Sequence, residues 1–68
     1  MRKVTYKKLW KLLVDREMSK ADLRKAIEMA PNTLTKMRKN EEVSLAMLLK
    51  IANYLDCDIS DICEFIKE

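Results

Sequence analysis

The chain has 68 residues, 49% of them hydrophobic and 37% charged, and this length allows one small domain over residues 1–68. Glycine is absent, proline occurs once and long alternating apolar runs are missing, so the composition favours an all-α fold over a sheet. No apolar stretch is long enough to cross a bilayer, and the charged start lacks the apolar block of a signal peptide, so we expect a cytoplasmic protein.

Charge is divided unevenly along the chain. Residues 1–40 carry twelve Lys and Arg against four Asp and Glu, a net charge of +8, whereas residues 41–68 carry two against seven, a net charge of −5. The basic part can attract phosphate while the acidic part repels it, an arrangement that orients a protein on DNA. A solvated, lysine-rich helix surface explains the same asymmetry, so charge alone favours nucleic acid only modestly.

Hydrophobic periodicity predicts five helices, and the first three occupy the basic part of the chain. The first extends from about Tyr6 to Arg16, with Thr5 as its cap. Its apolar face combines Leu9, Trp10, Leu12 and Leu13. The second, about Lys20 to Ile27, is capped by Ser19. The third, about Pro31 to Arg38, starts with a proline whose missing N–H costs nothing in a first turn.

The last two predicted helices follow a short polar loop, Lys39 to Val43. Asn40 suits the end of the third helix because asparagine tolerates the left-handed conformation. Ser44 is expected to cap the fourth helix, and a fifth is expected from near Asp58 or Ser60 to about Ile66. The core stripe of the fourth is expected to consist of Leu45, Leu48, Leu49, Ala52 and Leu55, with Ile51 beside it. The chain stops where the fifth helix is expected to stop, which leaves nothing over for a sensor or catalytic domain.

The second and third helices have the layout of a DNA-binding motif. Two short helices are joined by a tight turn within MSKADLRKAIEMAPNTLTKMRKN at 18–40. Leu34 and Met37 form the inner face of the third helix and leave Asn32, Thr33 and Lys36 pointing outward. Such an arrangement is that of a helix-turn-helix, whose second helix reads base edges in the major groove.

These residues resemble the lambda-repressor-like family of phage repressor and Cro proteins and xenobiotic-response-element regulators, most of all its small stand-alone bacterial members. The matching pieces are MSKADL at 18–23, PNTLTKM at 31–37, VSLAMLLKIANYL at 43–55 and DISDI at 58–62. The resemblance covers essentially the whole chain and implies a compact five-helix domain with the helix-turn-helix at helices two and three. It implies a transcriptional regulator, most simply a repressor, that binds double-stranded DNA.

Carried over by position, the resemblance assigns DNA contacts to eight residues. Those expected to contact bases are Pro31, Asn32, Thr33 and Lys36, and those expected to contact phosphates are Lys20, Thr35, Lys39 and Asn40. The amide of Asn32 can pair with adenine N6 and N7, although it could instead bond its own backbone. Thr33 could touch a thymine methyl group or a phosphate, or merely satisfy the first helical turn. For Lys36 a phosphate is favoured over guanine, because lysine lacks the fixed fork of arginine.

The chain departs from the family pattern at three positions. The usual glycine of the turn is Glu28, which either alters the turn or adopts a strained conformation. A usual alanine of the second helix is Arg24, whose stem is expected to lie between the helices with its charge outward. The glycine common after the recognition helix is Asn40.

Other residues are expected to be structural. Cys57 and Cys63 do not form a C-x-x-C pair and have no histidine to share a metal with, so they are interpreted as small buried hydrophobic residues rather than zinc ligands. Trp10 could stack on a base but is better explained as core. Arg2 and Lys3 could form an arm along the DNA, although a frayed terminus is the simpler interpretation. No spacing suggests a nucleophile with its base, so neither catalytic residues nor a cofactor are expected.

One recognition helix reads only a few base pairs, so a homodimer on a palindromic site is expected. The predicted dimer surface lies on helices four and five and is formed by Met47, Ile51, Tyr54, Ile62, Phe65 and Ile66. The alternative is a protein-interaction module, such as an antitoxin or anti-repressor, that holds its partner on an acidic face of helix five. No membrane association and no small-molecule ligand are expected.

Overall fold

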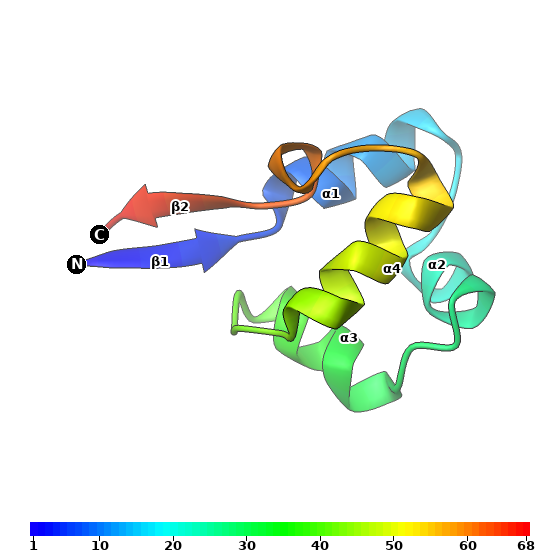
Figure 1. The fold of residues 1–68 in the computed structure, drawn as a ribbon, viewed down its shortest axis with the longest axis horizontal. Helices are drawn as coiled ribbons and strands as arrows, with labels where there is room; N and C mark the ends of the chain where they lie inside the picture. Colours follow the sequence, from blue (N-terminus) through cyan, green and yellow to red (C-terminus); the bar gives the residue numbers. More distant parts are fainter.

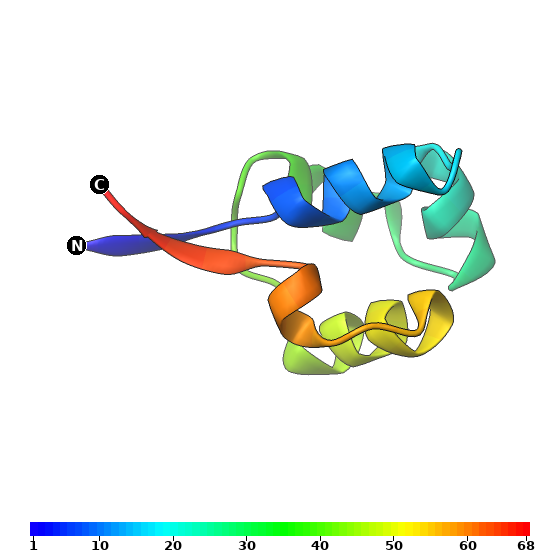
Figure 2. The same cartoon turned by 90° about the horizontal axis from the view of Figure 1, so that it is seen from above.

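The computed structural model describes residues 1–68. Its elements in chain order are strand β1 (Arg2–Thr5), helices α1 (Lys7–Asp15), α2 (Lys20–Ala26), α3 (Pro31–Arg38) and α4 (Leu45–Leu55), the 3-10 turn η1 (Ile59–Asp61) and strand β2 (Glu64–Lys67). The four helices form the body, and the two strands project from it as a narrow antiparallel sheet with both chain ends at its tip (Figure 1). Seen from above, the two strands cross as they project from the body, which shows the twist of the sheet (Figure 2). None of the helices has the length and apolar character that crossing a bilayer requires.

Local polar groups determine where α2, α3 and α4 begin. The Ser19 hydroxyl accepts the amide of Asp22, and the Asp22 carboxylate accepts the amide of Ser19, which completes a capping box. The Ser44 hydroxyl accepts the amide of Met47 at the start of α4. Pro31 occupies the first turn of α3. The sequence predictions at these three helix starts are confirmed.

The start of α1 differs from the prediction. The helix begins at Lys7, and Thr5 is the last residue of β1 rather than the cap. The N-cap residue, Tyr6, makes no side-chain cap bond, but the Thr5 hydroxyl accepts the amide of Lys7 at 3.4 Å, and the amide of Leu9 donates to the carbonyl of Ile62 at 3.2 Å. A carbonyl from the far end of the chain therefore satisfies one of the unpaired first-turn donors, a partner that local sequence cannot reveal.

All four helices end at a left-handed residue, and none of these residues is glycine. The φ angles are 57° at Glu17, 56° at Glu28, 60° at Asn40 and 54° at Asp56. The amide of the residue that follows each of them donates to the carbonyl five positions earlier, in the last turn of the helix. An example is the 2.9 Å bond from the Met18 amide to the Leu13 carbonyl. Asn40 therefore ends α3 as predicted, and at Glu28 the strained alternative is the one adopted.

Nine hydrophobic side chains form one buried core between the helices, Tyr6, Leu9, Leu13, Leu23, Met29, Met37, Ile51, Leu55 and Ile62. The predicted core stripe of α4 is wrong in part, because Leu45 and Leu49 are 72% and 60% exposed while Ile51 and Leu55 are buried. This helix is apolar on more than one face, so periodicity alone does not identify the face that packs inward.

The predicted fifth helix does not form, and the all-α fold class is corrected accordingly. After a capping box between Asp58 and Asp61 the chain makes the single turn η1, buries Ile62 and continues as β2. Strand β2 pairs with β1 in the register Arg2↔Lys67 to Thr5↔Glu64. A helix of this length is marginal on its own, whereas pairing with β1 supplies backbone partners that a local pattern cannot show. The same pairing makes Arg2 and Lys3 strand residues rather than a frayed terminus.

The left-handed helix ends predict that a glycine introduced there stabilises the protein. Glu17→Gly should raise the free energy of unfolding by about 1 kcal/mol, because glycine adopts positive φ without the steric cost of a Cβ. Lys11→Gly, inside α1, should lower it by about 1 kcal/mol. Urea denaturation followed by circular dichroism measures both, and a destabilising Glu17→Gly would contradict the assigned backbone conformation.

The corrected C-terminal segment predicts unequal roles for its two isoleucines. Ile62→Ala should lower the free energy of unfolding by about 2–5 kcal/mol, because the side chain is fully buried in the core. Ile59→Ala should cost well under half as much, since Ile59 is 43% exposed. Thermal unfolding of the two variants provides the comparison. Equal losses would indicate that the segment packs through a different face.

Candidate nucleic-acid interface

The turn between α2 and α3 is held by one side chain from α2. The carbonyl of Arg24 accepts the amide of Met29 at 2.8 Å, and the Arg24 guanidinium donates to the carbonyl of Met29 at 3.4 Å. The Met29 side chain between these bonds is buried in the core. Arg24 is half-buried, and its guanidinium bonds the turn instead of being carried outward as predicted. The two departures at Arg24 and Glu28 therefore work together to set the angle of α3.

The start of α3 presents unpartnered polar groups. Pro31 and Asn32 are exposed, Thr33 is half-buried, and neither the Asn32 amide nor the Thr33 hydroxyl has a hydrogen-bond partner in the protein. The alternative in which the side chains of Asn32 and Thr33 form hydrogen bonds with the backbone of their own helix is therefore not seen. Thr35 differs, because its hydroxyl donates to the Pro31 carbonyl at 3.1 Å.

Cationic side chains without acidic partners surround this surface. Lys20, Lys36 and Lys39 are exposed, and none of them forms an ion pair, since the only two salt bridges join Lys3 to Glu68 and Lys8 to Glu64. Exposed charges that form no ion pair are available to phosphate.

The Lys20 ammonium has a neighbour that the sequence did not suggest. Its Nζ lies 4.5 Å from the centroid of the Trp10 ring, within the range of a cation–π contact. Trp10 is half-buried against the core, as predicted, and its ring also lies 6.5 Å from that of Tyr6.

Strand β1 adds two cations that sequence reasoning had interpreted as frayed. Arg2 and Lys3 line a surface hollow together with Lys36 and Asn40, and Glu41 and Glu42 border the same hollow. The signal was present as a basic pair at the start of the chain. Its position beside α3, however, depends on pairing with β2 and could not be read locally.

Two half-buried thiols lie outside this surface. Cys57 and Cys63 are both free, and burial raises the pKa of each thiol. Burial is also the main cause of the raised pKa of the Tyr6 phenol, whose hydroxyl donates to the carbonyl of Glu41 at 2.7 Å. No group of three or more potential ligands has a metal-binding arrangement.

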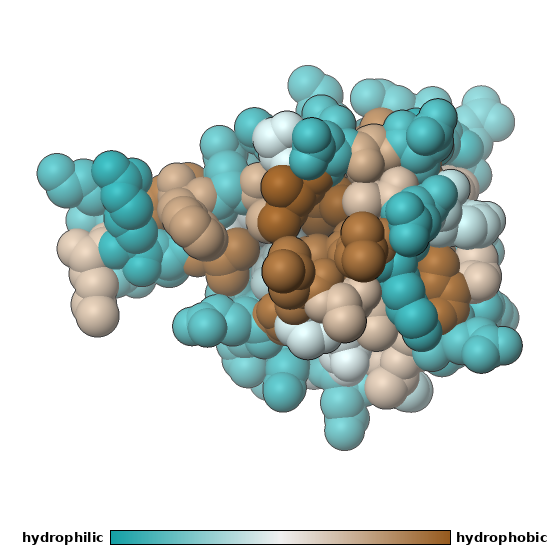
Figure 3. All heavy atoms as spheres, viewed as in Figure 1, coloured by the Kyte–Doolittle hydropathy of each residue, from teal (hydrophilic) through white to brown (hydrophobic).

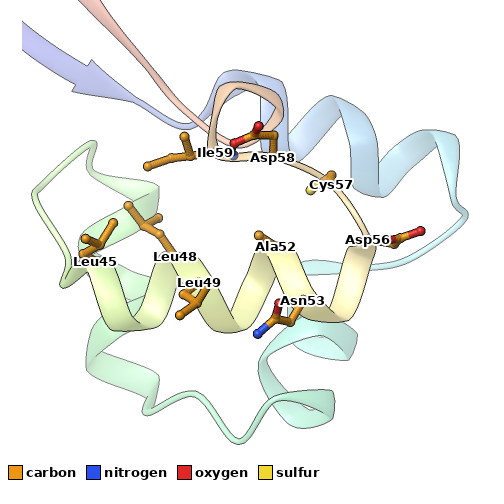
Figure 4. A pocket seen from close by; sticks show the side chains of 9 residues that line it. All are labelled: Leu45, Leu48, Leu49, Ala52, Asn53, Asp56, Cys57, Asp58 and Ile59. Atoms are coloured by element: carbon orange, nitrogen blue, oxygen red, sulfur yellow. Dashed lines mark hydrogen bonds between the residues drawn. The ribbon is translucent and has the colours of Figure 1, made fainter.

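The apolar surface differs from the one predicted for a dimer. Ile51 and Ile62 are buried in the core, and the acidic helix-five face that the interaction-module alternative required does not exist as a helix. Instead, a groove of about 560 Å³ extends along α4 toward η1 (Figure 4). We define the α4 groove by its apolar residues Leu45, Leu48, Leu49, Ala52 and Ile59. Hydrophobic residues gather at the centre of this face of the molecule (Figure 3).

Comparison with known proteins identifies the family. Residues 8–68 match the family described as the Cro/C1-type HTH DNA-binding domain. A crystal structure of the transcriptional regulator VanUg, Form II, is 51% identical, with a TM-score of 0.96 over 98% of this chain and 89% of that chain. No curated protein matches this sequence significantly. The matched region contains α2, the turn and α3 in full, so the chain belongs to the Cro/C1-type helix-turn-helix DNA-binding family.

Proposed function

We propose that this protein is a sequence-specific regulator of transcription that inserts α3 into the major groove of duplex DNA. The observation that carries the proposal is the surface of α3, where Asn32 and Thr33 expose polar groups without partners. Lys20 before that surface and Lys39 after it are cations without ion pairs. Family membership and the likeness to the transcriptional regulator VanUg support the same function.

Base contacts are assigned to the outward residues of α3. Asn32 pairs with adenine N6 and N7, and Thr33 packs on a thymine methyl group or donates to a phosphate. Pro31 shapes the start of the helix and offers an apolar contact. Lys36 reaches a phosphate or a guanine edge, with phosphate favoured because a single ammonium gives no bidentate geometry.

Phosphate contacts are assigned to the two ends of the motif. Lys20 approaches the backbone at the start of α2, while Lys39 and Asn40 approach it after α3. Thr35 would have to exchange its bond to the Pro31 carbonyl for one to phosphate. These contacts position the protein on the duplex and carry no sequence information themselves.

Repression is the regulatory action we assign. A protein that occupies promoter DNA blocks access by polymerase, and this requires only the DNA-binding surface described above. Activation requires in addition a surface that contacts the transcription machinery, so repression is the simpler assignment.

A single α3 reads too few base pairs to select one site in a genome, so we propose that two copies bind a palindrome. The α4 groove is the proposed contact between the copies. Leu45 and Leu49 are largely exposed there, and Phe65 on β2 is 70% exposed beside the adjoining hollow. Large apolar side chains gathered on one face favour a protein contact.

Charge supports a second copy as the occupant of the α4 groove. Asp56 lies at one end of it, whereas the hollow that adjoins its other end at Leu45 is lined by Arg2, Lys3 and Glu42, with Lys3 also paired to Glu68. In a two-fold dimer the same patch meets itself in the opposite direction. Asp56 of each copy then faces the end that carries Arg2 of the other, which places opposite charges together.

Selection from random duplex DNA at two salt concentrations tests the DNA-binding proposal. We expect enrichment of a short palindrome and weaker binding as salt rises. Asn32→Ala should weaken the binding free energy by about 1–3 kcal/mol and relax the sequence preference at one base pair. Lys39→Ala should weaken binding to all sequences alike and reduce the slope of log affinity against log salt concentration by about 1. Lys50→Ala, on α4 outside the motif, is the matched control. Absence of binding at low salt would overturn the proposal.

Sedimentation equilibrium at micromolar concentration, with and without the selected DNA, tests the dimer. The wild-type protein should reach twice 8.0 kDa, and Leu45→Glu should remain a monomer because it places a charge in the contact. Val14→Glu is the matched control, since Val14 is equally exposed at 72% but lies on α1 outside the α4 groove. A wild-type monomer even on its operator, or a dimeric Leu45→Glu, would contradict the proposed surface.

A further inference from the structure

Two aromatic residues, Trp10 on α1 and Tyr6 immediately before it, contact the two ends of the DNA-binding motif. Tyr6 and Trp10 are four residues apart, so they lie on the same side of the chain, with ring centroids 6.5 Å apart and ring planes at 56°. Neither residue belongs to α2 or α3. Their polar contacts nevertheless lead to the segments that precede and follow α3.

The contact made by Tyr6 lies just after the recognition helix. Its hydroxyl donates to the Glu41 carbonyl at 2.7 Å, across 35 residues of sequence. The amide of Glu41 donates to the Lys36 carbonyl at 2.8 Å, so the backbone of this residue is bonded through its N–H to α3 and through its C=O to Tyr6. Lys39 and Asn40 immediately precede it, and the buried Tyr6 ring anchors the bond to the core.

The contact made by Trp10 lies at the opposite end of the motif. The Lys20 ammonium lies 4.5 Å from the centre of the Trp10 ring, and Lys20 is the first residue of α2. A lysine at an exposed helix start otherwise has four rotatable bonds and no fixed position. The half-buried indole, which is packed against the core, gives the ammonium a defined place.

We propose that Tyr6 and Trp10 are positioning residues for DNA binding, which hold the two phosphate-contacting ends of the motif at a fixed separation. This inference rests on the proposed function, which assigns phosphate contacts to Lys20 and Lys39. Tyr6 fixes the backbone of Glu41, two residues after Lys39, through its hydroxyl, and Trp10 fixes the Lys20 ammonium through its ring face. Preorganised cations lose less freedom on binding, so affinity rises although neither aromatic touches a base.

Salt-dependent binding to a duplex of fixed sequence tests the inference. Tyr6→Phe removes only the hydroxyl, and Trp10→Leu removes the aromatic face while keeping apolar volume. Each variant should bind this duplex several-fold more weakly, with a salt slope close to that of the wild-type protein, because the phosphate contacts are still made but at a higher entropic cost. Tyr54→Phe is the matched control, because Tyr54 is half-exposed on α4 and lines neither the α4 groove nor the motif.

Double-mutant cycles separate positioning from a general loss of stability. Tyr6→Phe should have little further effect once Lys39 is alanine, and Trp10→Leu little further effect once Lys20 is alanine. A merely structural role would lower the unfolding midpoint and weaken binding equally in every background. That result would overturn the inference. A wild-type protein without salt-dependent duplex binding would instead overturn the proposed function, so the two failures are distinguishable.

Discussion

The arrangement of the helices depends on four left-handed residues in a chain that contains no glycine. Each helix must end and change direction within a short connection for the next element to reach the common core, and positive φ provides that change of direction. Asn40 and Asp56 have short polar side chains that tolerate the conformation, whereas Glu17 and Glu28 adopt it at a cost of about 1–2 kcal/mol each. The core-facing methionine after each glutamate, Met18 and Met29, helps to offset that cost.

The DNA-binding surface inherits its geometry from these turns. Glu28 directs the chain from α2 into α3, and Arg24 bonds both backbone polar groups of Met29 through its carbonyl and its guanidinium. Asn40 ends α3, and Lys39 beside it faces solvent. Very little of this precision comes from ion pairs, which leaves the lysines of the motif unneutralised. Rigid backbone next to free charge is the combination that phosphate recognition needs.

Sequence reasoning succeeded where structure is local and failed where a distant partner decides. Capping by Ser19 and Ser44, the place of Pro31 and the left-handed Asn40 follow from residue chemistry within one helical turn, and all four are observed. The C-terminal strand was mistaken for a helix because its pattern suits either element, and only β1, at the opposite end of the chain, selects the strand. Asn32 and Lys36 of α3 are exposed as predicted, whereas Thr33 is half-buried. The contact between Lys20 and Trp10 depends on how α1 packs against α2, which local sequence does not show.

The sheet has a consequence for the order of folding. It pairs Arg2 with Lys67, so its loop-closure entropy is that of almost the whole chain, whereas successive helices meet through short connections. The helical body must therefore assemble first and bring the two ends together before the strands can pair. In the native state the strands then separate more readily than the core opens, and their amide hydrogens exchange with solvent through that local opening while those of α1 and α4 stay protected.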